Sequence, residues 1–152
     1  MSLTQDPVIV HCGTTHYVFV EKVGPFNETA PQSWQELHAL VPEIAVKNKI
    51  GKYFAEYKVD SKAVYRAGVS VAAAPTDLPA GLRYEALSGG KYSRFTYVGP
   101  HSGLSRISGE VWSHVREKEI AVRDDFSLEN YESDPETTPD SELVTEILIP
   151  TM

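Results

Sequence analysis

The sequence is poor in the residues that would indicate disulfides, metal clusters or membrane spans. Its single cysteine, Cys12, cannot form an internal disulfide, and its five histidines show no metal-ligand spacing, so we expect no metal and no cofactor. No Gly-x-Ser-x-Gly motif marks a serine hydrolase. The apolar runs are too short to cross a bilayer, and the N-terminus lacks the pattern of a signal peptide. We therefore expect a cytoplasmic protein that binds no membrane.

Basic residues are also missing from the last part of the chain. After Arg123 there is no lysine or arginine but nine acids, which leaves 14 basic and 12 acidic residues in positions 1–123. An acidic end repels nucleic-acid phosphates, so we expect no nucleic-acid partner. We interpret these acids as a solvated, solubilising region, with Glu146 as the exception.

Residue patterns predict eight extended segments and two helices. The extended segments are expected at residues 8–12, 16–23, 52–59, 63–71, 82–87, 91–98, around 130–132 and at 143–149. Apolar residues at helical spacing predict helices from 28 to about 42 and from 104 to about 120. The Gly89-Gly90 pair suits a tight hairpin or a bulge between two of the strands, because glycine adopts positive φ without strain.

The order of these segments contains a repeat. A strand ending in Gly24-Pro25 and a strand ending in Gly99-Pro100 are each followed by a tryptophan-bearing helix and then by two extended segments. The sequence therefore predicts a single α+β domain over residues 1–152, made of duplicated β-α-β-β halves at about 8–75 and 82–150. We expect the halves to form one antiparallel sheet with two helices on one face and a ligand cleft on the other, at the seam.

The last strand carries an acid in an apolar setting. Glu146 shares a face with Val144 and Leu148, while apolar residues and a threonine occupy the other face. A buried acid must be paired, protonated or matched by a cationic ligand. A structural ion pair with Arg66 or Arg94 remains an alternative to ligand binding, and small residues at 67–68 are expected to lie beside the carboxylate and leave room for a ligand.

Four stretches in a fixed order carry a family resemblance. They are YRAGV at 65–69, LSGGKY at 87–92 with VGP at 98–100, the segment 126–131, and TEILIP at 145–150. The chain resembles the GyrI-like small-molecule-binding domain, which is also the effector-binding domain of AraC-type and MerR-type multidrug regulators. The resemblance covers about residues 17–150. It implies an SHS2-like duplicated fold and an aromatic pocket with an acidic residue at its base, which Glu146 matches.

The resemblance implies a ligand-binding function with two alternatives. It implies binding of lipophilic, cationic small molecules in an aromatic pocket. We expect Glu146 to be the charge anchor of this pocket and Tyr65, Tyr92, Tyr57 and Trp34 to be its walls. Because no segment of roughly 60–100 residues remains for a helix-turn-helix domain, we expect a stand-alone sensor or sequestering protein. The second interpretation is a hydrolase of cyclopropane-type compounds in which Glu146 is catalytic and a tyrosine donates a proton. The third is a gyrase-inhibitor-like role, in which the acidic residues 124–142 contact an unknown protein partner.

Overall fold

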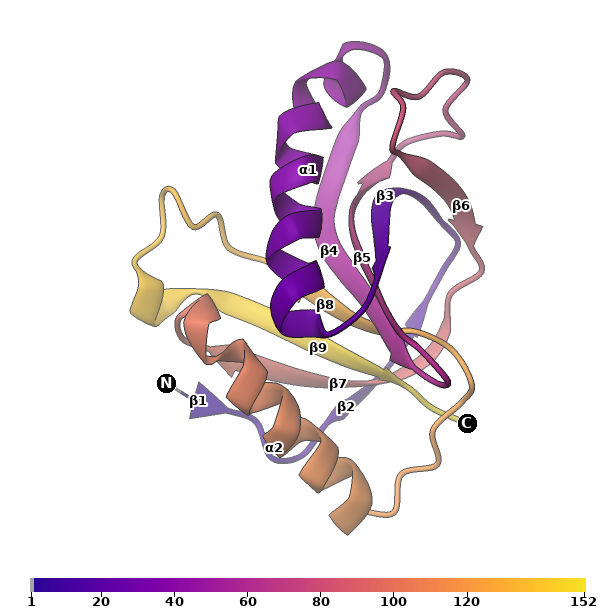
Figure 1. The fold of residues 1–152 in the computed structure, drawn as a ribbon. Coiled ribbons are helices and arrows are strands. Elements are labelled where there is room, and N and C mark those ends of the chain that lie inside the picture. The colour runs from indigo at the N-terminus through magenta and orange to yellow at the C-terminus, as the bar shows by residue number, and fades with distance from the viewer. Residues whose placement is uncertain (1) are drawn as a thin grey trace. The chain divides into compact units, whose positions relative to one another are not determined.

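The computed structural model describes residues 2–152, which form two units. The continuous unit comprises residues 13–89, and the split unit comprises residues 2–12 together with 90–152 (Figure 1). Every strand pairing within each unit is antiparallel, and each unit carries one long helix. The predicted α+β class is therefore confirmed. No helix within residues 2–152 is both long and apolar enough to cross a membrane.

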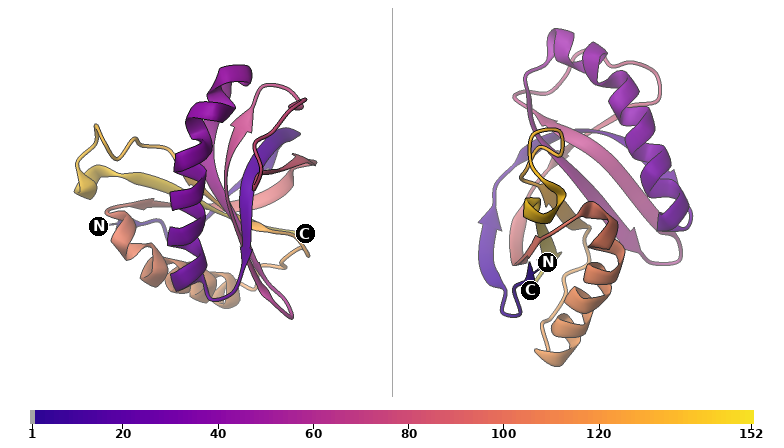
Figure 2. Two further views of the ribbon diagram at one scale, coloured as in Figure 1. Left: turned by 45° about the horizontal axis from the view of Figure 1, so that its top comes forward. Right: turned by 90° about the vertical axis from the view of Figure 1, so that its left-hand side faces the viewer.

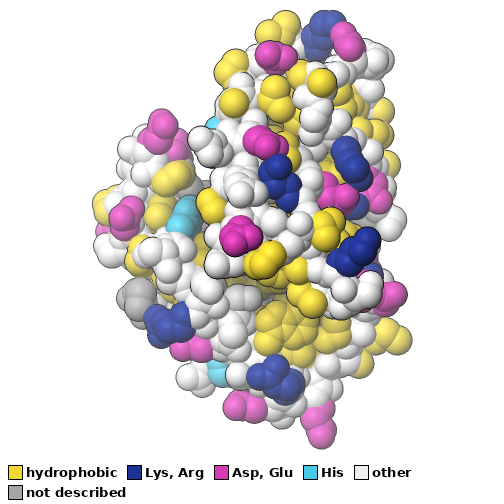
Figure 3. All heavy atoms as spheres, in the orientation of Figure 1, with side chains coloured by type: hydrophobic (Ala, Val, Ile, Leu, Met, Phe, Trp, Pro, Cys, Tyr) yellow, Lys and Arg dark blue, Asp and Glu magenta, His cyan; other side chains and the backbone are white. Residues whose placement is uncertain are grey.

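The continuous unit is a four-stranded sheet with one helix against it. Its elements are β3 (Thr15–Val23), α1 (Phe26–Lys47), β4 (Ile50–Val59), β5 (Ala63–Val71) and β6 (Arg83–Leu87). The strands lie in the order β4-β5-β3-β6. Helix α1 packs on β5 and β3, where its buried Leu37 and Ile44 meet the sheet face that carries Val18 and Val69. Figure 3 shows acidic and basic side chains over the region that this helix and the elements beside it occupy.

The split unit places its sheet against α2. Its elements are β1 (Ser2–Leu3), β2 (Val8–Cys12), β7 (Gly90–Val98), the short 3-10 helix η1 (His101–Gly103), α2 (Leu104–Glu117), β8 (Ser127–Tyr131), η2 (Asp140–Glu142) and β9 (Val144–Pro150). Strand β7 pairs with β9 on one side and with β1 and β2 on the other, and β8 pairs with β9. Phe95, Ile147 and Ile149 pack with Ile107 and Val111 of α2. Figure 2 shows the ribbon of α2 beside the strands of this unit.

Each unit starts its helix with the same dipeptide. Gly24 and Gly99 have φ values of 142° and 156°, and each precedes a proline that begins the turn into the helix. The Gly24 amide donates to the carbonyl oxygen of Ala63, and the Gly99 amide donates to that of Leu143, each at 2.9 Å. Both units show the order strand, helix, strand, strand. Duplication itself stays a prediction.

The structure differs from the sequence analysis at two strands and one helix. Strand β2, expected in the first half, pairs with β7, and β6, expected in the second half, pairs with β3. The Gly89-Gly90 segment therefore connects the two units along the chain and does not form a hairpin, although both glycines have positive φ. Helix α1 continues past Pro42 to Lys47, because burial of Ile44 after the proline opposes the cost of the missing hydrogen bond.

We expected the small residue Gly68 to lie beside Glu146 and to leave room there for a ligand. Strand β9 has β7 and β8 as neighbours within its unit, so Glu146 lies opposite Thr96 and Asn130. The ring of Tyr17 covers Gly68, and a Cβ at this position would be 2.4 Å from Tyr17 Cε1 and 2.6 Å from the carbonyl oxygen of Val18. The small residue is used for packing inside its own unit.

This contact generates a stability prediction. Gly68→Ala is expected to lower the free energy of unfolding by about 1–3 kcal/mol, because the backbone oxygen of Val18 cannot move aside cheaply. Gly109→Ala is the matched control, since nothing lies within 4 Å of the added methyl group in α2, and it is expected to raise the free energy by about 0.5–1 kcal/mol. Urea denaturation of both variants checks the pair, and an unchanged midpoint for Gly68→Ala would contradict the packing.

Candidate functional site

Strand β8 carries a carboxyl group on the buried side of the split unit. Glu129 is only 9% exposed and lies opposite Ile147, which belongs to the core packed against α2. The hydroxyl of Tyr131 donates a hydrogen bond of 2.9 Å to Glu129 Oε1. Within the described part of the split unit, no lysine or arginine forms an ion pair with this carboxyl. A desolvated acid without a cation is an unusual group in a folded protein.

Burial controls the protonation of Glu129. Desolvation raises the pKa of this carboxyl to about 7, against the smaller lowering by the Tyr131 hydrogen bond. Near neutral pH the group therefore exists in both forms. A carboxyl group in this condition can gain a cation or exchange a proton, which are the two properties that binding and acid–base chemistry require.

Two further polar groups lie near Tyr131 without hydrogen-bond partners. The His101 ring stands 5.3 Å from the Tyr131 ring, between centroids, and burial lowers the pKa of this histidine. Its Nε2 is enclosed and makes no hydrogen bond to any described residue. Thr145 lies opposite Tyr131 on β9, and its fully buried hydroxyl also lacks a partner among the described residues. Buried polar atoms of this kind are costly unless a water or ligand satisfies them.

Glu146 lies on the other face of the same sheet. It alternates with the core residues Thr145 and Ile147, its side chain is 21% exposed, and its Oε2 lies 3.5 Å from Arg94 Nε. Burial and the neighbouring Glu132 carboxyl raise the pKa of Glu146, while Arg94 lowers it. The structure thus supplies the Arg94 ion pair that the sequence analysis left open as the alternative. Arg66, the other cation considered there, instead binds Glu21, Glu56 and Glu85.

The predicted aromatic residues divide into two groups. Tyr92 lies on the Glu146 face of β7, two residues before Arg94, with the Arg123 guanidinium 5.1 Å from its ring centroid. Tyr57 and Tyr65 lie opposite each other in the continuous unit and both contact Phe26 of α1, at 5.8 Å between ring centroids.

Trp34 joins the second group. Its Nε1 donates a hydrogen bond of 2.8 Å to the hydroxyl of Tyr65. Trp34, Tyr57 and Tyr65 therefore form one aromatic cluster on the α1 side of their sheet. Glu146 and Tyr92 lie on the side of their sheet away from α2. Three of the five predicted residues thus lie on the helix side of their sheet and two on the side away from the helix. Their role in binding stays a prediction.

The sequence analysis overlooked Glu129 because it interpreted the acids after Arg123 as solvated. That interpretation is wrong for this residue. A usable signal was present, since Ser127, Glu129 and Tyr131 alternate with Leu128 and Asn130, which places an acid and a tyrosine side by side on one strand face. Among the described residues, no group of three or more His, Cys, Asp or Glu side chains is suited to hold a metal ion.

Comparisons with known proteins agree with this architecture. The antiparallel sheets, each with a long helix on one side, define an α+β domain with a buried carboxyl on the helix side. The family model for the GyrI-like small molecule binding domain matches residues 5–152, so the chain belongs to this family. The comparison with curated protein sequences found no match.

Solved structures show the same fold at low identity. The C-terminal domain of EcmrR has a TM-score of 0.79 and 12% identity, covering 100% of this chain and 99% of that one. SAV2435, solved with bound tetraphenylphosphonium, has a TM-score of 0.75 and 16% identity, covering 97% and 94%. A protein from Listeria innocua described as a hydrolase has a TM-score of 0.62 and 12% identity, covering 97% and 92%.

The raised pKa of Glu129 generates a prediction for stability. The folded chain binds a proton here more tightly than the unfolded chain, whose pKa is near 4.5, so the stabilising contribution is complete below about pH 4.5 and is lost as the pH rises to about 7. The total loss is about 3 kcal/mol.

Denaturation of the wild type and Glu129→Gln at pH 5 and pH 8 checks this dependence. The glutamine resembles the neutral acid, so the variant is expected to be more stable than wild type at pH 8 and nearly equal at pH 5. His101 titrates in the opposite sense but is common to both proteins, so its effect cancels in the difference. Equal pH slopes for the two proteins would show that Glu129 titrates normally.

Proposed function

We propose that this chain binds lipophilic cations through the carboxylate of Glu129, as a sensor or sequestering protein. The observation that carries the proposal is a buried carboxyl group with a pKa of about 7 and no paired cation among the described residues of its own unit. A cation that displaces water here would stabilise the charged form, and burial strengthens their attraction. Membership of a small-molecule-binding family and the tetraphenylphosphonium bound to SAV2435 support this choice of ligand class.

The surrounding groups fit an aromatic cation. Tyr131 offers a ring as well as its hydroxyl, and His101, with a lowered pKa, stays neutral near pH 7 and adds no competing charge. Cation–π contacts contribute about 0.5–2 kcal/mol each. The binding roles expected for Tyr65, Tyr57, Trp34 and Tyr92 stay predictions and form no part of this proposal.

Titration with tetraphenylphosphonium at pH 8 tests the anchor. Glu129→Gln is expected to weaken binding by about 30-fold or more, because it removes the charge and keeps the shape. Glu146→Gln is the matched control and is expected to change the dissociation constant less than about threefold, since its carboxyl already pairs with Arg94. Equal binding by wild type and Glu129→Gln would show that Glu129 is not the anchor. A loss of affinity confined to Glu146→Gln would show that Glu146 is the anchor instead.

The pH dependence of the same titration provides an independent check. Tetraphenylphosphonium keeps its charge at every pH, so its affinity should rise from pH 5 to pH 8 as Glu129 loses its proton. The rise should be absent in Glu129→Gln and for the neutral analogue triphenylphosphine oxide. An affinity independent of pH in the wild type would contradict the role of a carboxyl with this pKa.

A hydrolase is the second candidate, favoured by the 2.9 Å pair of Glu129 and Tyr131. In hydrolysis of a cyclopropane-bearing compound, Glu129 would take a proton from water, whose oxygen bonds to one ring carbon as the carbon–carbon bond breaks. Tyr131 would give its proton to the other carbon and recover it from Glu129 across their hydrogen bond. A carboxyl with a pKa near 7 suits a general base.

Product formation separates this candidate from binding alone. Glu129→Gln and Tyr131→Phe are each expected to lower kcat by about 10²- to 10⁴-fold, whereas Glu146→Gln should leave it unchanged. Full turnover by Glu129→Gln would exclude the mechanism, and binding without turnover in the wild type would leave the first proposal alone.

A further inference from the structure

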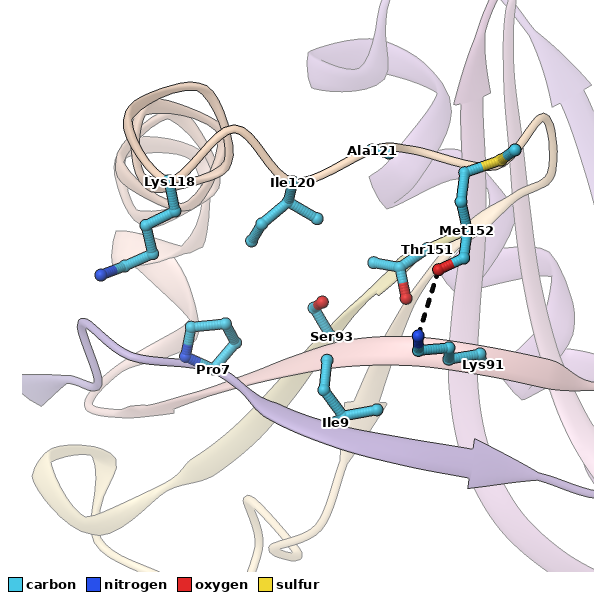
Figure 4. Close-up of a pocket in the computed structure, with 9 residues that line it drawn as sticks. All are labelled: Pro7, Ile9, Lys91, Ser93, Lys118, Ile120, Ala121, Thr151 and Met152. Atoms are coloured by element: carbon cyan, nitrogen blue, oxygen red, sulfur yellow. Dashed lines mark hydrogen bonds between the residues drawn. The ribbon is translucent and has the colours of Figure 1, made fainter.

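A separate cavity lies in the split unit beside the C-terminal end of α2, on the same side of the sheet as this helix (Figure 4). Its volume is about 270 Å³, and it is bounded by residues from β2, β7, the segment after α2 and the end of the chain. Neither Glu129 nor Tyr131 lines it. The cavity is open to solvent, and its volume is sufficient for a small organic ligand.

The turn at the end of α2 builds one wall of this cavity. Glu119 has a φ of 54°, and the amides of Glu119 and Ile120 donate to the carbonyl oxygens of Arg116 and Val115 at 3.2 and 3.0 Å. This pair of bonds is a Schellman motif, which reverses the chain after the helix. It turns Ile120 back onto the sheet, where it packs against the core, and Ala121 follows it as cavity wall.

Two hydroxyl groups at the base of the cavity lack partners. Ser93 is 1% exposed and Thr151 is 4% exposed, and neither side-chain oxygen makes a hydrogen bond to any described residue. Figure 4 shows both oxygens directed into the space enclosed by the lining residues. They come from neighbouring strand segments, since the Thr151 amide donates to the carbonyl oxygen of Lys91 at 3.0 Å. Two buried hydroxyl groups without a hydrogen-bond partner among the described residues therefore line the same cavity.

The remaining lining residues define the rest of the ligand. The walls are apolar, with Pro7, Ile9, Ile120 and Ala121, and no acidic side chain lines the cavity. Two lysines stand at its edge. Lys118 forms an ion pair with Asp6 at 2.6 Å, and the ammonium of Lys91 donates a hydrogen bond to the main-chain oxygen of Met152 at 3.2 Å. An acceptor with negative charge and a short apolar tail fits two hydroxyl donors, a nearby ammonium group and aliphatic walls.

We propose that this cavity is a second binding site, which takes small carboxylates such as butyrate or benzoate. The carboxylate oxygens accept hydrogen bonds from Ser93 and Thr151, and the tail packs against Ile9 and Ile120. The site is independent of Glu129, which takes ligands of the opposite charge.

Titration of the full chain with butyrate and benzoate tests the site, with two-dimensional NMR reporting the location. The expected result is shifts at residues 91–93, 118–121 and 151–152 that saturate. Thr151→Val and Ser93→Ala are each expected to weaken binding by about 10- to 100-fold, because each removes a hydrogen bond to a charged group. Thr145→Val is the matched control, since it removes an equally buried and unpartnered hydroxyl from the same strand face outside the cavity, and it should leave butyrate affinity unchanged.

Two comparisons decide between a ligand site and a structural role. Without ligand, Thr151→Val should raise Tm by about 2–4 °C, because a buried unpaired hydroxyl is replaced by a methyl group of the same shape. Butanol and butylamine should bind more weakly than butyrate. Absence of saturable shifts with butyrate and benzoate, equal affinity of Thr151→Val and wild type, or equal affinity for butanol would each overturn the proposal. Glu129→Gln should bind butyrate as tightly as the wild type does. The butyrate test therefore remains valid even if Glu129 binds no cation.

Discussion

Ionising a carboxyl group on the buried face of a sheet is costly, and Glu129 is such a group. Glu129 faces the core packed against α2, where Tyr131 supplies a hydroxyl donor and the described residues of the same unit supply no ion pair. The group is therefore held near its point of half-ionisation at neutral pH. Its protonation responds to whatever binds beside it, and a cation is the ligand that lowers this cost most. The side chains of His101 and Thr145 nearby also carry buried polar atoms that make no hydrogen bond to any described residue.

Glu146 shows why a similar acid is a weaker candidate. Both glutamates lie within one pair of strands, but strand alternation directs Glu146 to the other face, where Arg94 compensates its charge. Burial and a neighbouring acid also raise the pKa of Glu146, so a perturbed pKa alone does not separate the two residues. The two residues differ in the partner of each carboxyl group and in the face of the sheet on which each lies.

The sequence predicted the elements better than their partners. Strand and helix patterns placed nearly every element within a few residues, and the positive φ values of Gly24, Gly89, Gly90 and Gly99 agree with glycine at those turns. Periodicity does not encode which strand lies beside which, so the exchange of β2 and β6 between units was not foreseen. The same limit applies to Gly68, whose small size serves Tyr17 of the adjacent strand.

The site was harder to predict because charge counts do not report burial. The acids after Arg123 look alike in the sequence, yet Glu129 is buried and Asp134, Glu136 and Asp140 are exposed. Trp34, Tyr57 and Tyr65 do cluster, as aromatic residues on a helix and on adjacent strands often do. The cavity with Ser93 and Thr151 had no sequence signal, because it depends on the chain reversal at Glu119.

Titration of the Glu129 carboxyl carbon by ¹³C NMR, with and without tetraphenylphosphonium, tests the central claim most directly. The account predicts a pKa of about 7 in the free protein and a lower pKa when the cation is bound. A pKa near the ordinary value of about 4.5 in the free protein, or a raised pKa that the cation leaves unchanged, would contradict it.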